Sequence, residues 1–170
     1  MNNKAFTILE LLGAILVISI GVLTAYGVVQ SIVTYTIDSS DRITAAYLAK
    51  EGVELVRNIR DKNWVANLSW NQGLSQDYWE IDYDDPSLFH CVSCTGASTD
   101  FNYLRSLKNS ASPTYNYTYN YTSGTNSKFK RKISITPDGA DKIKIIVDVF
   151  WSKRGQTHSI SVQENIYDWK

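Results

Sequence analysis

The feature that most constrains the fold is a long apolar segment near the start of the chain. Residues 11–37 contain no charged side chain, and residues 11–29 are interrupted only by the hydroxyl side chains Ser19 and Thr24. A helix needs about 20 mostly apolar residues to cross the hydrocarbon core of a bilayer. The segment therefore predicts a membrane-spanning helix, which leaves the later residues to form any folded domain.

A cleavable secretory signal is the alternative interpretation of this segment. The apolar core of such a signal has about 7–15 residues, follows a basic stretch and precedes a small-x-small cleavage site. Here Lys4 is the only basic residue before the core and Glu10 stands directly in front of it, although Ala-Tyr-Gly at residues 25–27 offers a cleavage site. The length and the flanks favour a retained helix.

Helical periodicity continues beyond the apolar segment. No proline occurs before Pro86. Apolar residues recur at steps of three and four positions and form one stripe, made of Ala45, Leu48, Gly52, Leu55, Val56 and Ile59. We therefore expect one continuous helix from Phe6 to about Arg60, apolar all round in its first half and amphipathic in its second half.

The C-terminal third has the alternation of β-strands. Turn signals at residues 136–141 (TPDGAD) and 152–156 (SKRGQ) separate three alternating runs. The apolar positions are Phe129, Ile133 and Ile135, then Ile143, Ile145, Val147, Val149 and Trp151, and then Ile160 and Val162. This pattern predicts a three-stranded antiparallel meander. The amphipathic helix would cover its apolar face, and Trp169 would pack back onto the resulting α+β head.

Glu10 requires an explanation, because it stands at the edge of the apolar segment. A charged side chain inside a membrane helix costs about 2.5–3.5 kcal/mol even on the gentler insertion scales. On its own helix the only basic residue near it is Lys4. A partner could come from another subunit, or from a new amino terminus if the chain were cut before Phe6.

Residues 5–12, AFTILELL, resemble the processing motif of type IV prepilins and of type II secretion pseudopilins. In that family an aspartic peptidase in the membrane removes a short polar leader, the new N-terminus is methylated, and the fifth residue after the cut is a glutamate. The resemblance implies cleavage between Ala5 and Phe6 and N-methylation of Phe6. It also implies that Glu10 serves assembly by neutralising the amine of a neighbouring subunit.

The sequence departs from the family's pattern at two positions and resembles the family in one further segment. Ala5 replaces the usual glycine, and Gly27 stands where many major pilins have a proline that kinks the helix. Residues 48–64, LAKEGVELVRNIRDKNW, resemble a helix end that is common in minor-pilin-like proteins of this superfamily.

The resemblance implies a domain organisation and a role. A leader would occupy residues 1–5, a transmembrane and filament-core helix residues 6–30, its amphipathic continuation residues 31–60, and an extracytoplasmic β-rich head residues 61–170. The protein would be a non-enzymatic pilin or pseudopilin, a minor one, without a cofactor or metal. It would insert in the bacterial inner membrane and then enter a surface or periplasmic filament. Its partners would be other subunits and the prepilin peptidase, rather than nucleic acid. The alternative is an unprocessed single-pass anchor that displays a binding head.

Cys91 and Cys94 form a C-x-x-C pair. No βαβ pattern precedes the pair, and the head is expected outside the cytoplasm, where disulfides persist. We therefore favour a structural disulfide over free thiols, over a metal site with His90 and over a redox function.

Three clusters of polar or aromatic residues can each be interpreted as a functional site or as part of the fold. An acidic run at Asp77, Glu80, Asp82, Asp84 and Asp85 lacks the spacing of a calcium loop, which favours a solvated loop. Lys128, Lys130, Arg131 and Lys132 around Phe129 favour the charged outer face of a strand over contact with DNA. Tyr115, Tyr117, Tyr119 and Tyr121 favour a strand or an edge loop over an adhesive patch.

The aromatic composition and the charge balance add two further expectations. Three of the five tryptophans lie between Trp64 and Trp79, where they are expected to anchor the connecting region to the core rather than to form a binding patch. Seventeen basic residues balance 17 acidic ones, so no global field steers the chain to polyanions. The only histidines are His90 and His158, and neither stands in a recognisable catalytic pattern.

Overall fold

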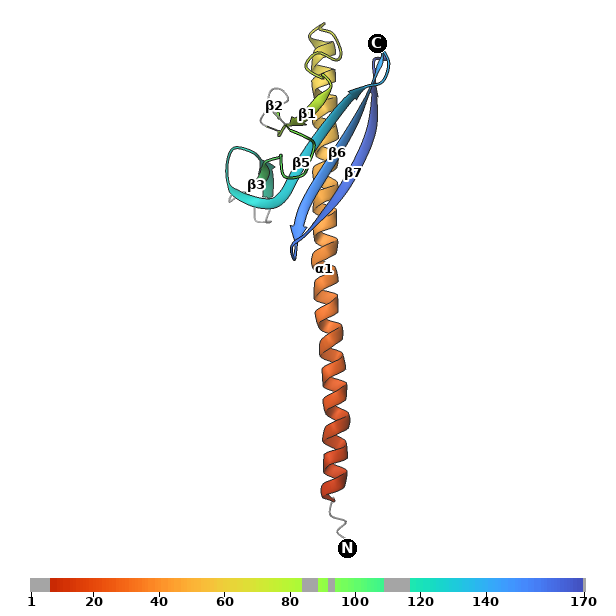
Figure 1. Ribbon diagram of the computed structural model, residues 1–170, viewed down its shortest axis with the longest axis vertical. Coiled ribbons are helices and arrows are strands. Elements are labelled where there is room, and N and C mark those ends of the chain that lie inside the picture. The colour runs from red at the N-terminus through yellow and green to blue at the C-terminus, as the bar shows by residue number, and fades with distance from the viewer. Residues whose placement is uncertain (1–6, 84–88, 92–93, 109–116, 170) are drawn as a thin grey trace. The chain divides into compact units, whose positions relative to one another are not determined.

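The computed structural model describes residues 7–83, 89–91, 94–108 and 117–169 (Figure 1). One long helix, α1, is followed by the strands β1 to β7. Their bounds are α1 Ile8–Val65, β1 Asp77–Glu80, β2 Phe89–His90, β3 Tyr103–Lys108, β4 Tyr117–Asn120, β5 Thr125–Pro137, β6 Lys142–Lys153 and β7 Gln156–Tyr167. The chain divides into two compact units, Met1–Asp41 and Arg42–Lys170, which we call the N-terminal unit and the head.

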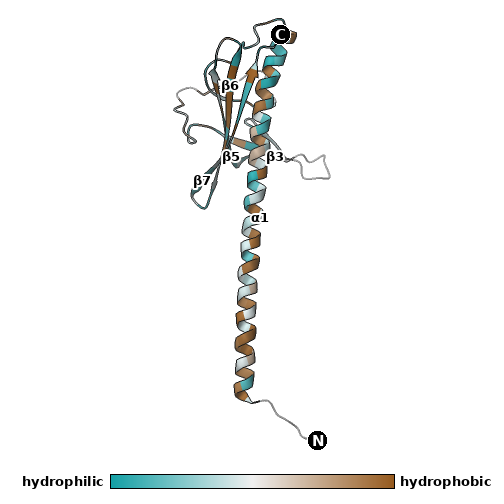
Figure 2. Ribbon diagram, turned by 90° about the vertical axis from the view of Figure 1, so that its right-hand side faces the viewer, coloured by the Kyte–Doolittle hydropathy of each residue, from teal (hydrophilic) through white to brown (hydrophobic). Residues whose placement is uncertain are grey.

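The N-terminal unit consists, in its described part, of Thr7 and residues 8–41 of α1. Every residue from 7 to 33 is exposed, and the hydropathy colours in Figure 2 show this part of the helix as mainly apolar. The helix passes through Gly27 without a break. A helix that is apolar on all sides, and that none of the described residues covers, is suited to lipid or to other helices.

The head is built on one antiparallel sheet. Strand β5 lies in its middle, with β6 along one side and β1 and β3 along the other. Strand β7 continues the sheet beyond β6, while β2 and β4 continue it beyond β1 and β3. Strands β5, β6 and β7 form the predicted meander, so this prediction is confirmed.

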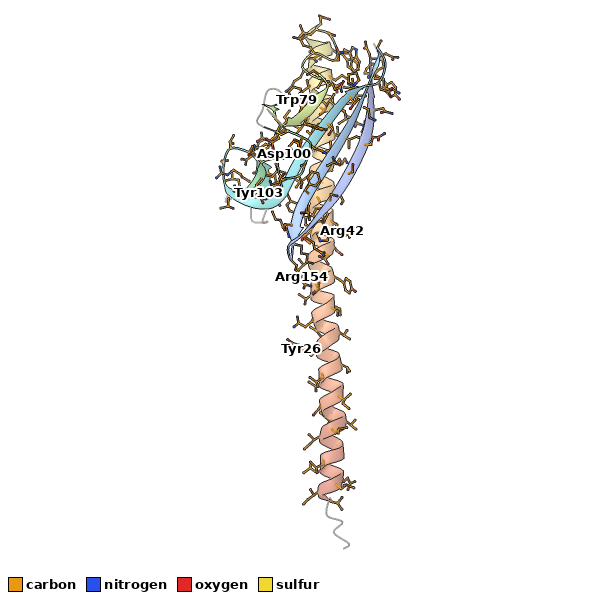
Figure 3. All side chains as sticks on the ribbon, viewed as in Figure 1. Tyr26, Arg42, Trp79, Asp100, Tyr103 and Arg154 are labelled. Carbon is orange, nitrogen blue, oxygen red and sulfur yellow. A yellow bond between two sulfur atoms is a disulfide. The ribbon has the colours of Figure 1, made fainter. Side chains whose placement is uncertain are left out.

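The turns of the meander fall where the sequence predicted them. Arg154 (φ 49°) and Gly155 (φ 77°) connect β6 to β7, and Arg154 marks the tip of this hairpin in Figure 3. Positive φ at both central residues is the signature of a two-residue type I′ turn, whose twist matches that of the flanking strands. In the β5–β6 connection, the Asp138 N–H donates to the Lys142 carbonyl oxygen at 2.9 Å.

The core of the head lies between the last third of α1 and the sheet. The helix contributes Ala45, Leu48, Ala49, Val53 and Val56, and the sheet contributes alternate residues of β5 and β6. At Gly52 the helix lies close to the sheet, because a Cβ built there would be 2.9 Å from Cγ1 of Val147. The buried stripe of the helix is slightly rotated from the predicted stripe, because Leu55 and Ile59 are only partly buried at its edge.

The remaining differences concern the connecting region. Helix α1 ends at Val65 rather than near Arg60. The region after it, where the sequence predicted no clear helices and a strand or edge loop only at the tyrosine repeat, supplies four short strands. Trp70 is buried, whereas Trp64 and Trp79 are partly buried against the core. The Trp169 ring remains exposed but meets the Trp64 ring edge-on, with centroids 4.5 Å apart.

Candidate functional site

The candidate site is the start of α1, where Thr7 acts as the helix cap. The Glu10 N–H donates to the Thr7 hydroxyl at 3.2 Å, and the Leu11 N–H donates to the Thr7 carbonyl oxygen at 3.1 Å. Thr-x-x-Glu is the sequence of a capping box. The sequence interpretation above missed this role, although the spacing of Thr7 and Glu10 was the signal for it.

The bond that caps the helix does not involve the Glu10 carboxylate. The bond to Thr7 uses the backbone N–H of Glu10, not its side chain. Glu10 lies in the first turn of α1 and is exposed. There the helix dipole stabilises a negative charge by about 0.3–1 kcal/mol, and it disfavours a positive charge by a similar amount.

Five serine and threonine side chains within the apolar part of α1 satisfy their hydroxyl donors inside the helix. Each bonds to a backbone carbonyl one turn earlier: Ser19 to Ile15 at 2.7 Å, Thr24 to Ile20 at 3.0 Å, Ser31 to Gly27 at 3.0 Å, Thr34 to Gln30 at 3.0 Å and Thr36 to Ile32 at 2.9 Å. Unsatisfied polar groups cost several kcal/mol in hydrocarbon. These hydroxyls therefore place no demand on a partner outside the helix.

The same helix is long and apolar enough to cross a membrane, by length and composition. The best window of the helix has none of its residues buried within the head or elsewhere in the chain. Tyr26 projects from this part of the helix in Figure 3. Gly13, Gly21 and Gly27 have nothing within 4 Å of a built Cβ, so space is open for close approach by another helix.

Part of the predicted processing site lies outside the residues that the structure describes. Ala5 and Phe6, and with them the whole leader 1–5, are outside the described residues. Among the predicted site residues of this segment, the structure describes Glu10.

The predicted cysteine pair lies in a loop of the head. Cys91 and Cys94 are joined as a disulfide, and both sulfur atoms lie 3.8 Å from the Asp100 carbonyl oxygen. The Asp100 carboxylate accepts from the Thr95 hydroxyl at 2.9 Å and from the Thr95 N–H at 2.7 Å. These bonds lower the pKa of Asp100 below its ordinary value of 3.8. Asp100 thus organises the segment that follows the pair (Figure 3).

The acidic run is not a solvated loop in its described part, which corrects that prediction. Glu80 and Asp82 are buried. Glu80 accepts from the Asn102 N–H at 2.6 Å, and Asp82 accepts from the Tyr121 N–H at 2.7 Å. Buried carboxylates need such donors, so they join the connecting region to the sheet. Asp84 and Asp85 lie outside the described residues.

Arg131 is the second correction, because it faces the core rather than the outer surface. Its side chain is 0% exposed, and it donates to the Leu48 carbonyl oxygen and to the Glu51 carboxylate, both at 3.1 Å. A further bond goes to the Ile81 carbonyl oxygen. Lys128, Lys130 and Lys132 alternate with it on the other face of β5. The regular alternation of strands already assigned position 131 to the buried face.

Tyr119 and Tyr121 also pack inward, against the core. Burial raises the pKa of the Tyr121 hydroxyl above its ordinary value. The predicted strand is present as β4, Tyr117–Asn120, and Tyr121 follows it directly. Tyr115 lies outside the described residues.

The described residues include no group of three or more His, Cys, Asp or Glu side chains arranged to hold a metal ion. Among the described residues, the apolar part of α1 and its first turn contribute no residue to the buried core.

Comparison with known proteins bears on this segment. Residues 1–26 match the family model of the prokaryotic N-terminal methylation motif. No curated protein and no solved structure matched the chain. The match covers the start of the chain through Tyr26, including the capped turn and Glu10.

Proposed function

We propose that this chain, which carries the N-terminal methylation motif of type IV pilins and type II secretion pseudopilins, is a structural subunit of such a filament. The motif and the α+β fold with its long apolar helix support a pilin-like role. The observation that carries the proposal is the exposed apolar helix with an acidic side chain in its first turn.

The proposed maturation begins in the inner membrane. The peptidase removes residues 1–5, and the amine of Phe6 is methylated. Residues 6–30 then form the filament core, residues 31–60 continue the helix, and residues 61–170 form the β-rich part of the chain outside the cytoplasm. The helix end at residues 48–64 favours a minor subunit over a major one.

The proposed assembly step is a charge neutralisation. The new amine lies one residue before the Thr7 cap, at the end of the helix where a positive charge is disfavoured. The Glu10 carboxylate of a neighbouring subunit offers the amine a partner. An isolated subunit in the membrane retains an unpaired acid, at a cost of about 2.5–3.5 kcal/mol. Assembly removes this cost, so the same charge fixes the register of the subunits and favours the filament.

The test substitutes Glu10 in cells that contain the native prepilin peptidase. Glu10→Leu leaves the cap intact, because the cap uses the backbone of residue 10. We expect the variant to insert into membranes at the wild-type level and to fall at least about tenfold in the sheared filament fraction, which corresponds to about 1.4 kcal/mol.

Two matched variants separate charge from helix capping. Thr7→Ala removes the capping hydroxyl and retains the carboxylate. Glu54→Gln removes a carboxylate from the same helix within the head, where Glu54 pairs with Arg57 at 2.9 Å. Both should reach the filament fraction. Filaments with wild-type amounts of the Glu10→Leu chain would contradict the charge-neutralisation mechanism.

A further inference from the structure

The outer face of the sheet carries a small cavity that neither the buried core nor the proposed filament role uses. Strand pairing places Tyr103 of β3 opposite Lys130 of β5, and Lys130 opposite Phe150 of β6. These three residues therefore form one row across three neighbouring strands, and paired side chains on one face of a sheet lie about 4.5–5.5 Å apart at Cβ. The row lines a cavity of about 210 Å³.

A second, polar row lines the same cavity. Lys128 lies two positions before Lys130 on β5, which puts both side chains on the same face of the strand. Ser152 of β6 and Thr157 of β7 are paired across the next two strands, and both line the cavity together with Lys128. The sheet thus contributes aromatic side chains from one row and hydroxyl groups from the other, with a lysine in each.

The loop that follows the disulfide closes one side of the cavity. Ser98 and Thr99 of this loop are part of the lining. The Nζ of Lys130 donates to the Thr99 carbonyl oxygen at 3.3 Å and lies 4.5 Å from the centre of the Tyr103 ring. An ammonium group has three donors, so Lys130 is fixed between the loop and the ring and still has donors for a ligand.

The charges that line the cavity have one sign. Lys128 and Lys130 are both part of the lining, and none of the described residues that line it is a carboxylate. Hydrogen bonds from an ammonium group to an anion are about twice as strong as bonds between neutral groups. The cavity therefore favours a ligand that carries a negative charge.

The uncharged part of the lining is suited to a sugar ring. Four hydroxyl side chains can each donate and accept a hydrogen bond: those of Ser98, Thr99, Ser152 and Thr157. The aromatic rings of the first row have electron-rich faces, against which the C–H groups of a sugar can pack. The cavity is smaller than the roughly 300–1,000 Å³ of pockets for larger ligands, so it suits a single unit.

A nucleic acid strand fits this surface less well, although it also uses basic and aromatic side chains. Proteins bind single strands through a basic groove that follows the backbone for about 4–16 nucleotides. The next lysine on this face of β5 is Lys132, which pairs with Asp148 at 2.8 Å and donates to the Gly96 carbonyl oxygen at 3.3 Å. The basic track is therefore short, which favours one acidic unit over a polyanion.

We infer that this cavity binds a sugar unit that carries a carboxylate. The carboxylate lies between Lys128 and Lys130, the sugar ring packs on the aromatic side chains of the first row, and its hydroxyls bond to the serine and threonine side chains. An adjacent cavity of about 510 Å³ shares Thr99, Tyr103 and Lys130. It leaves room for a neighbouring unit of an acidic polysaccharide.

The test uses the purified full chain in detergent micelles, with backbone amide resonances followed by NMR during titration with sodium glucuronate. We expect saturable shifts at the residues that line the cavity, with a dissociation constant of about 1 mM. Glucose lacks the carboxylate and acetate lacks the ring, so at equal ionic strength both should bind about tenfold more weakly. Glucuronate that binds no more tightly than acetate, or that leaves the cavity resonances unchanged, would overturn the inference.

A matched pair of lysine substitutions tests the site on the protein side. Lys128→Gln removes an exposed ammonium group that lines the cavity, whereas Lys144→Gln removes one from the outer face of β6 outside the lining. The first variant should bind glucuronate about tenfold more weakly, and the second should retain the wild-type affinity. Equal losses in the two variants would show general attraction between charges and would overturn the inference. Unchanged amide resonances far from the cavity verify that both variants are folded.

Two further titrations distinguish the source of the ligand. A linear galacturonate trimer that binds at least about tenfold more tightly than galacturonate would support a polysaccharide as the source, and equal affinities would support a free sugar acid. An oligothymidylate that binds the cavity more tightly than glucuronate would overturn the inference in favour of a nucleic acid strand. None of these assays requires processing at Phe6 or assembly, so their outcome is independent of the filament role.

Discussion

Residues 8–41 and residues 42–65 of helix α1 differ in where their apolar side chains are accommodated. The earlier part exposes them on all sides, and five of its serine and threonine hydroxyls donate to its own backbone. The later part buries one stripe against the sheet and exposes polar residues elsewhere. One continuous element thus contains a segment that packs against its own chain and a segment whose exposed apolar surface is suited to lipid or to other helices.

The comparison predicts that substitutions in the later part change the stability of the head, whereas those in the earlier part change insertion or assembly. The chain offers a selective probe, because its five tryptophans, Trp64, Trp70, Trp79, Trp151 and Trp169, all lie in the head. Tryptophan fluorescence during denaturation of the full chain in micelles therefore reports on the head.

The largest effect is expected for the buried guanidinium. Arg131→Ala leaves Glu51 and two buried carbonyl groups without their donor, and it should lower the free energy of unfolding by about 3–5 kcal/mol. Lys130→Ala is the control, since Lys130 lies on the opposite face of β5 and donates to the Thr99 carbonyl oxygen at 3.3 Å. Its loss should cost less than about 1 kcal/mol. Denaturant midpoints measure both, and equal values would show that the Arg131 network does not stabilise the head.

Overpacking gives a direct contrast between the two parts of the helix. Gly52→Leu forces a side chain against Val147 and should destabilise the head by about 1–3 kcal/mol. Gly21→Leu adds the same atoms where nothing lies within 4 Å, so the fluorescence midpoint should remain unchanged. A shift of the midpoint with Gly21→Leu would mean that the earlier segment contributes to the stability of the head.

The cysteine pair should have a smaller and more local effect. The two residues are 3 apart in sequence, and closure of so short a loop stabilises by about 2 kcal/mol at most. Cys91→Ser should loosen the segment that Asp100 organises and retain the sheet, as hydrogen exchange can show. Alkylation of the wild-type chain without reductant should modify neither cysteine. Modification of both would indicate free thiols in place of the disulfide.

The smallest effect is expected from acidification of the β5–β6 turn. The bond from Lys142 lowers the pKa of Asp138 from its ordinary value of 3.8 and raises that of Lys142. A carboxylate with a lowered pKa in the folded state stabilises that state above its unfolded pKa, and the contribution is lost as the pH falls through the folded pKa. Asp138→Asn should abolish this part of the melting-temperature decrease below pH 4. An unchanged pH profile would show that the pair is fully screened.

The sequence alone was sufficient to predict the secondary structure where a segment has a single dominant periodicity. The helix, the meander and its two turns follow from apolar spacing and turn residues, which local sequence encodes directly. The short strands β1 to β4 were not predicted as a set, because their pairing with β5 and with one another depends on contacts between segments distant in the chain.

Buried charge was the main difficulty for sequence interpretation. Arg131, Glu80 and Asp82 are of charged residue types that usually lie on the protein surface. Their partners are mostly backbone groups of other segments. Composition cannot reveal such partners, although the alternation between Phe129 and Ile133 would have placed Arg131 on the inner face, contrary to the outer-face prediction. The Thr7 cap, in contrast, was present as a local motif and could have been predicted.

The most direct test of the filament role is the mass of the N-terminal peptide of this chain, isolated from membranes that contain its native prepilin peptidase. We predict a peptide that begins at Phe6 and is heavier by one methyl group. A peptide that retains residues 1–5 would contradict the proposed maturation, and would instead identify an unprocessed anchor that displays the head.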